Sequence, residues 1–87
     1  MSVEQPASVP EVLEVDGQGL DATGILVHVA KSTRFLSRGT RVEVRSNRRD
    51  VQADLRAWAA WAGHAYDGLT ADPGGTFVAR IRAYATR

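Results

Sequence analysis

The chain has 87 residues, of which 44% are hydrophobic and 24% charged, with a formal net charge of +1 and no cysteine. This length and balance fit one small globular domain and leave too little chain for two cores. The lack of cysteine excludes disulfides, thiol catalysis, persulfide carriage and thiolate metal sites.

The N-terminal segment, residues 1–10, is expected to be a disordered lead-in, because Pro6 and Pro10 lie among polar residues without hydrophobic periodicity. It has neither the basic region nor the apolar run of a secretion signal, and no stretch near 18 apolar residues follows. We therefore expect a cytoplasmic protein with no membrane span, whose single domain covers residues 11–87.

The first half of the domain predicts a strand, a helix and a second strand. Val12–Asp16 is the first expected strand, and a helix beginning at Thr23 or Gly24 is expected to run to Leu36. Residues 40–46 alternate strictly between apolar and polar side chains, which is typical of a strand with one buried face.

The second half predicts a helix and a hairpin. Ser46 or Asn47 is expected to cap the helix and Gly63 to end it. The apolar stripe of this helix is formed by Val51, Leu55, Trp58 and Ala62. Residues 64–71 and 76–84 then read as two strands joined across Asp-Pro-Gly-Gly.

This element order, β-α-β-α-β-β, predicts an α+β fold. Two helices of similar length must both bury their apolar stripes on one sheet, which gives a two-layer sandwich with a four-stranded mixed sheet and both helices on one face. The other face is expected to be open and to carry mixed charges that serve solubility and cross-strand pairing. These charges are Arg41, Glu43, Arg45, Arg80 and Arg82.

Four segments carry a resemblance to a known family: VDGQGLDATGIL, FLSRGTRVEV, RSNRRDV and LRAWAAWAGHAYDG. Over residues 15–68 the chain resembles, without a gap, the TusA/SirA-like family of small sulfur-carrier proteins. Members typically run Leu-Asp-x-x-Gly-Leu-x-Cys-Pro-x-Pro-Ile-Leu, with the cysteine at a helix N-terminus. The helix dipole pushes that thiol toward the thiolate, which accepts a sulfane sulfur and passes it on.

In this register Ala22 stands at the family cysteine, and Thr23 and Ile25 stand at the two prolines. Ala22 removes the only atom that could hold the sulfur, so the resemblance implies the fold and not the sulfurtransferase activity. An engineered Cys-to-Ala carrier is one alternative. The change of both proline positions favours a naturally degenerate member, which is not an enzyme and needs no cofactor.

The resemblance also implies a protein partner. Family carriers dock on cysteine desulfurases and sulfur-acceptor enzymes through the surface around the N-terminus of the first helix. We therefore expect a protein that regulates or scaffolds sulfur-transfer machinery, with Asp21 able to cap that helix and Trp61 lying off the apolar stripe of the second. The expected partner-binding residues are Asp21, Ala22, Thr23, Gly24, Ile25, Leu26 and Trp61.

The sequence gives weaker support to other functions. The arginines between Arg34 and Arg49 leave an RNA-binding basic face as an alternative, although the small net charge disfavours nucleic acid. A ligand binder or an enzyme that uses groups other than thiols is a further alternative. His28 and His64 are expected to be partly exposed, and no carboxylates join them at metal-ligand spacing.

Overall fold

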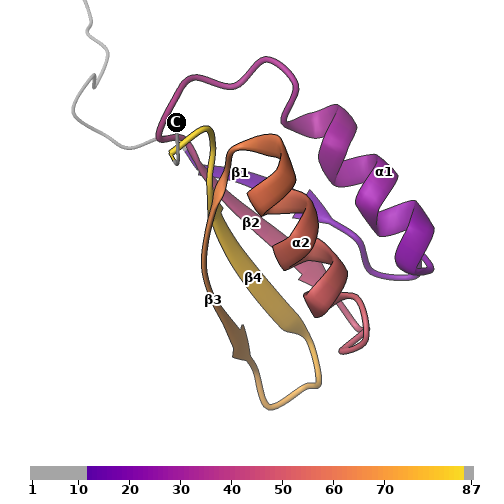
Figure 1. Cartoon of the computed structure of the whole chain (residues 1–87). Helices are drawn as coiled ribbons and strands as arrows, with labels where there is room; N and C mark the ends of the chain where they lie inside the picture. Colours follow the sequence, from indigo (N-terminus) through magenta and orange to yellow (C-terminus); the bar gives the residue numbers. More distant parts are fainter. Residues whose placement is uncertain (1–11, 86–87) are drawn as a thin grey trace, which may run out of the picture.

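The computed structural model describes residues 12–85, which form four strands and two helices (Figure 1). The expectation for residues 1–10 falls outside these residues. In chain order the elements are β1 (Val12–Asp16), α1 (Ala22–Ser32), β2 (Arg41–Ser46), α2 (Gln52–Ala62), β3 (Ala65–Ala71) and β4 (Phe77–Arg82).

The strands form one mixed sheet in the order β1-β2-β4-β3. β1 and β2 are parallel and joined by α1, whereas β4 is antiparallel to both β2 and β3. Figure 1 shows both helices on the same face of this sheet. The predicted two-layer α+β fold is therefore confirmed.

The core lies between the helices and the sheet. α1 buries Ile25 and Val29, which are one turn apart, and α2 buries Leu55. The strands contribute alternate residues because successive side chains point to opposite faces. The buried cluster consists of Val15, Ile25, Val29, Val42, Val44, Val51, Leu55, Ala79 and Ile81.

Helix α1 ends at Ser32, four residues before the predicted end at Leu36. Thr33 leaves the helical conformation, and its hydroxyl donates to the carbonyl of Val29 at 2.9 Å, so a side chain pairs with a carbonyl of the last turn. The hydroxyl of Tyr84 lies 3.0 Å from the carbonyl oxygen of Thr33 and donates to it. Leu36 packs against the core from the loop instead of from the helix.

Helix α2 begins at Gln52, so the prediction of a cap at Ser46 or Asn47 is wrong. Ser46 is fully buried, and its hydroxyl pairs with the backbone of Arg48 within the turn. The residue at the cap position is Val51, whose side chain packs in the core and makes no capping hydrogen bond. The C-terminal end is as predicted, with Gly63 in the left-handed conformation at φ 88°.

Candidate functional site

A tight loop joins β1 to the start of α1. Gly17 lies against β2, where its N–H donates to the carbonyl of Arg45 at 2.7 Å. A Cβ at Gly17 would stand 3.0 Å from that carbonyl oxygen and 3.0 Å from Cγ1 of Ile25, so only glycine fits without a shift. The N–H of Leu20 donates to the carbonyl of Gly17 at 3.1 Å and closes the turn. The loop therefore fixes where α1 begins.

Asp21 caps the helix, as the sequence predicts. Its backbone is extended, its Oδ1 accepts the N–H of Gly24 at 2.8 Å, and its carbonyl accepts the N–H of Ile25 at 2.9 Å. Ala22 is the first helical residue. A carboxylate at this position pairs one of the free donors of the helix and complements the positive end of its dipole.

The residues expected to bind a partner differ widely in exposure. Asp21 and Thr23 are exposed, and Ala22, Gly24 and Leu26 are half-buried. Ile25 is 0% exposed, so the expectation that a partner contacts its side chain is corrected. Ile25 lies one turn before Val29, and both belong to the buried cluster between the helix and the sheet.

Trp61 is 86% exposed, but it does not lie with the others. It lines a groove with Ala30 near the end of α1 and with Arg34 in the loop that follows. The structure therefore does not bring the expected partner-binding residues into one surface, because Trp61 belongs to the opposite end of the helix pair.

Two apolar side chains beside the cap were missed in the sequence. Leu20 is 39% exposed and Val27 is 48% exposed. Both line a groove of about 570 Å³ with Gly24 between them, and His28 and Lys31 stand at its side. A signal was present for Val27, since positions 24, 27 and 31 share one face of a helix, whereas Leu20 lies in the loop before the cap. We call Leu20, Gly24 and Val27 the α1 entry surface.

The α1 entry surface offers apolar contact edged by polar and charged groups, and no thiol stands at Ala22. Among residues 12–85 no group of three or more histidine, aspartate or glutamate side chains is placed to hold a metal ion.

His64 is only 3% exposed, so the expectation of a partly exposed histidine is wrong for this residue. Its ring lies between those of Trp58 and Tyr84, with centroids 4.9 and 4.6 Å away. Its Nδ1 accepts the backbone N–H of Tyr84 at 2.8 Å. Burial lowers the pKa of His64. The sequence signal for this burial was the position of His64 directly after the glycine that ends α2.

The open face of the sheet mixes charges of both signs. Arg82 donates two hydrogen bonds to Asp67 at 2.7 and 3.0 Å, and this pairing lowers the pKa of Asp67. Arg80 donates to the hydroxyl of Thr70 at 3.1 Å. One arginine of this face is therefore already paired with a carboxylate.

No protein-family model, curated protein or solved structure matches this chain. Within residues 12–85 neither helix, at 11 residues each, has the length and apolar character needed to cross a membrane.

Proposed function

We propose that this chain is a cysteine-less relative of the TusA/SirA-like sulfur carriers that binds a protein of the sulfur-transfer machinery without carrying sulfur. The observation that carries the proposal is Ala22, the first residue of a helix that follows a strand and a capped loop. In the register of the TusA/SirA-like resemblance, position 22 is that of the sulfur-bearing cysteine.

The α1 entry surface supports a docking role. Leu20 and Val27 are apolar side chains that remain in contact with water beside the helix N-terminus. Burying them against a partner is favourable, at about 25 cal/mol per Å² of apolar area. In this proposal the occupant is a cysteine desulfurase or a sulfur-acceptor enzyme, which the family's carriers contact with the same end of the helix.

The absence of a thiol at position 22 determines what binding does to such a partner. A chain with alanine at position 22 occupies a carrier's docking site and accepts no sulfur. It therefore competes with a true carrier, or holds the complex together, and this makes it a regulator or scaffold. The mixed charges of the open sheet face make RNA binding the weaker alternative.

The test is binding to a purified cysteine desulfurase from the source organism, measured by calorimetry. We expect Leu20→Glu to weaken binding by at least about tenfold, since losing an interface anchor costs roughly 2 kcal/mol. Leu69→Glu is the matched control, because Leu69 is 38% exposed on β3, against 39% for Leu20. We expect this control to bind within about twofold of the unmodified chain.

Mass spectrometry of the intact chain after incubation with the desulfurase and cysteine should show no added sulfur. Equal losses from Leu20→Glu and Leu69→Glu would contradict the docking surface. A persulfide-sized mass increase would contradict the non-carrier role. Binding to RNA that weakens steeply with salt would favour the nucleic-acid alternative, because counterion release makes phosphate contacts salt-dependent.

A further inference from the structure

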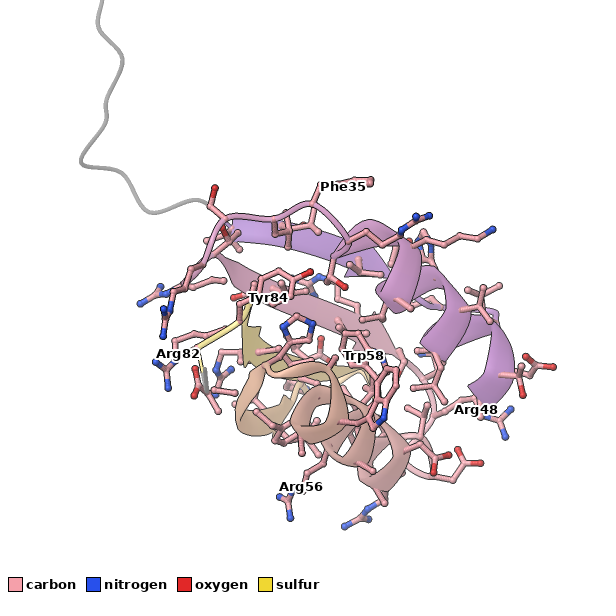
Figure 2. All side chains as sticks on the ribbon, turned by 45° about the horizontal axis from the view of Figure 1, so that its top comes forward. Phe35, Arg48, Arg56, Trp58, Arg82 and Tyr84 are labelled. Atoms are coloured by element: carbon pink, nitrogen blue, oxygen red, sulfur yellow. The ribbon has the colours of Figure 1, made fainter. Side chains whose placement is uncertain are left out.

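A second groove lies at the other end of α1, where the C-terminal ends of the two helices face each other. It has a volume of about 420 Å³ and its walls include Trp58, Trp61 and Tyr84. Ala30 on α1 and Ala62 on α2 also line it, and their short side chains leave the space between the helices open. Figure 2 shows Trp58 and Tyr84 on the side of α2 that faces α1.

His64 supplies a hydrogen-bond donor inside this groove. Because Nδ1 accepts the N–H of Tyr84, the neutral imidazole carries its hydrogen on Nε2. Among residues 12–85 every fully buried side-chain nitrogen or oxygen has a hydrogen-bond partner. His64 is 3% exposed and lines the groove, so its Nε2–H is the donor that this residue can offer to a ligand. The lowered pKa of His64 keeps the ring neutral at pH 7.

The wall opposite His64 is held in place by the fold. Tyr84 has a φ of 52°, a left-handed conformation that is costly for a residue with a side chain. Its N–H is bound to His64, and its hydroxyl lies 3.0 and 3.1 Å from the carbonyl oxygens of Thr33 and Arg34. Tyr84 and His64 are therefore fixed before any ligand enters, which reduces the entropic cost of binding, whereas Trp61 is exposed.

The lining of the groove contains one basic residue, Arg34, and no aspartate or glutamate. The C-terminal ends of the two helices carry partial negative charge, so Arg34 has to supply the attraction for an anion. The carbonyls of Ala59 and Ala60 at the end of α2 accept the N–H groups of His64 and Gly63, so they are already paired. The carbonyls beyond α1 are paired with Tyr84 in the same way.

Arg34 is available to a ligand at the rim of the groove. Its guanidinium carbon stands 5.3 Å from the ring of Phe35, and both side chains are exposed to water. A cation–aromatic contact at an exposed site is weak. A bidentate pair with a carboxylate is stronger, so a bound anion can draw Arg34 away from Phe35.

From this arrangement we propose that the groove binds a small planar aromatic carboxylate, with the ring packed on Trp61 and Trp58 and the carboxylate held by Arg34 and the Nε2–H of His64. The site is distinct from the α1 entry surface, since the two grooves share no lining residue. It therefore does not depend on the proposed docking function.

The test titrates the full chain with 2-naphthoate, followed by calorimetry and by ¹H–¹⁵N spectra that include the histidine ring nitrogens. We expect saturable binding with a dissociation constant below about 1 mM, and a shift of His64 Nε2. Two analogues should each bind at least about tenfold more weakly. The neutral amide 2-naphthamide lacks the charge that Arg34 binds, and cyclohexanecarboxylate lacks the aromatic ring that packs on the tryptophans.

Two exposed positions give variants that leave the fold intact. Trp61→Ala and Arg34→Gln should each weaken 2-naphthoate binding by about tenfold or more, whereas Arg41→Gln on the open sheet face should leave it unchanged. The proposal is overturned if the amide binds as tightly as the carboxylate, if Trp61→Ala has no effect, or if no binding occurs. Spectral shifts confined to Leu20 and Val27 would also overturn it, because they would place the ligand at the other end of α1.

Discussion

Restoring the family motif at the start of α1 tests where this helix begins and which of its residues reach the core. The double variant Ala22→Cys/Thr23→Pro should fold, because Thr23 is exposed and proline is tolerated in the first turn of a helix. Adding Ile25→Pro completes the motif. This third change should destabilise the protein strongly, unlike the first two.

The magnitude follows from the surroundings of Ile25. Its side chain is 0% exposed, and its N–H donates to the carbonyl of Asp21 at 2.9 Å. Losing the hydrogen bond costs about 1 kcal/mol, and replacing a buried isoleucine by the smaller proline ring costs about 1–3 kcal/mol more. A domain of 87 residues has a free energy of unfolding of roughly 4–13 kcal/mol. The triple variant should therefore lose a large fraction of its stability.

The assay is urea unfolding of the double and triple variants, with Ile25→Val as a control that keeps the N–H and should cost about 1 kcal/mol. The thiol of the double variant should have a pKa below that of an ordinary cysteine, because the helix N-terminus favours the thiolate. Equal stability of the double and triple variants would refute the burial of Ile25. A thiol pKa at or above the ordinary value would refute the placement of Ala22 at the helix N-terminus.

Three further outcomes are expected. Asp21→Ala should cost about 1 kcal/mol in urea unfolding through the lost cap, while Asp21→Asn should cost less; equal losses would contradict capping. Because burial lowers the pKa of His64, the free energy of unfolding should fall as pH drops below the ordinary histidine value, where the unfolded chain takes up the proton first; an unchanged pH slope in His64→Gln would contradict this. Arg82→Ala should leave the urea unfolding midpoint little changed, since its ion pair is exposed.

The fold could be predicted because hydrophobic periodicity dominates the local signals. Strict alternation over residues 40–46 identifies β2, and the glycine at position 63 marks the end of α2. The early end of α1 could not be predicted in the same way. The hydrogen bonds at that end include one from the hydroxyl of Tyr84 to the carbonyl of Thr33, 51 positions away in the chain.

The candidate site was predicted in part. A carboxylate before an apolar helix is a local capping signal, and Asp21 does cap α1. Ile25, which was expected among the partner-binding residues, is buried against the sheet because it lies one turn before Val29 on the same stripe. The burial of His64 was missed for a different reason: its partners, Trp58 and Tyr84, are brought to it by the tertiary fold.

The most direct test of the docking role is site-specific photo-cross-linking in the source organism, with p-benzoylphenylalanine in place of Thr23. Thr23 is exposed at the start of α1, and Thr70 on the open sheet face is the matched control. A cysteine desulfurase or a sulfur-acceptor enzyme should be identified by mass spectrometry in the adduct from position 23 and not in that from position 70. The same adducts from both positions, or adducts at position 23 only with proteins outside sulfur transfer, would contradict the proposed function.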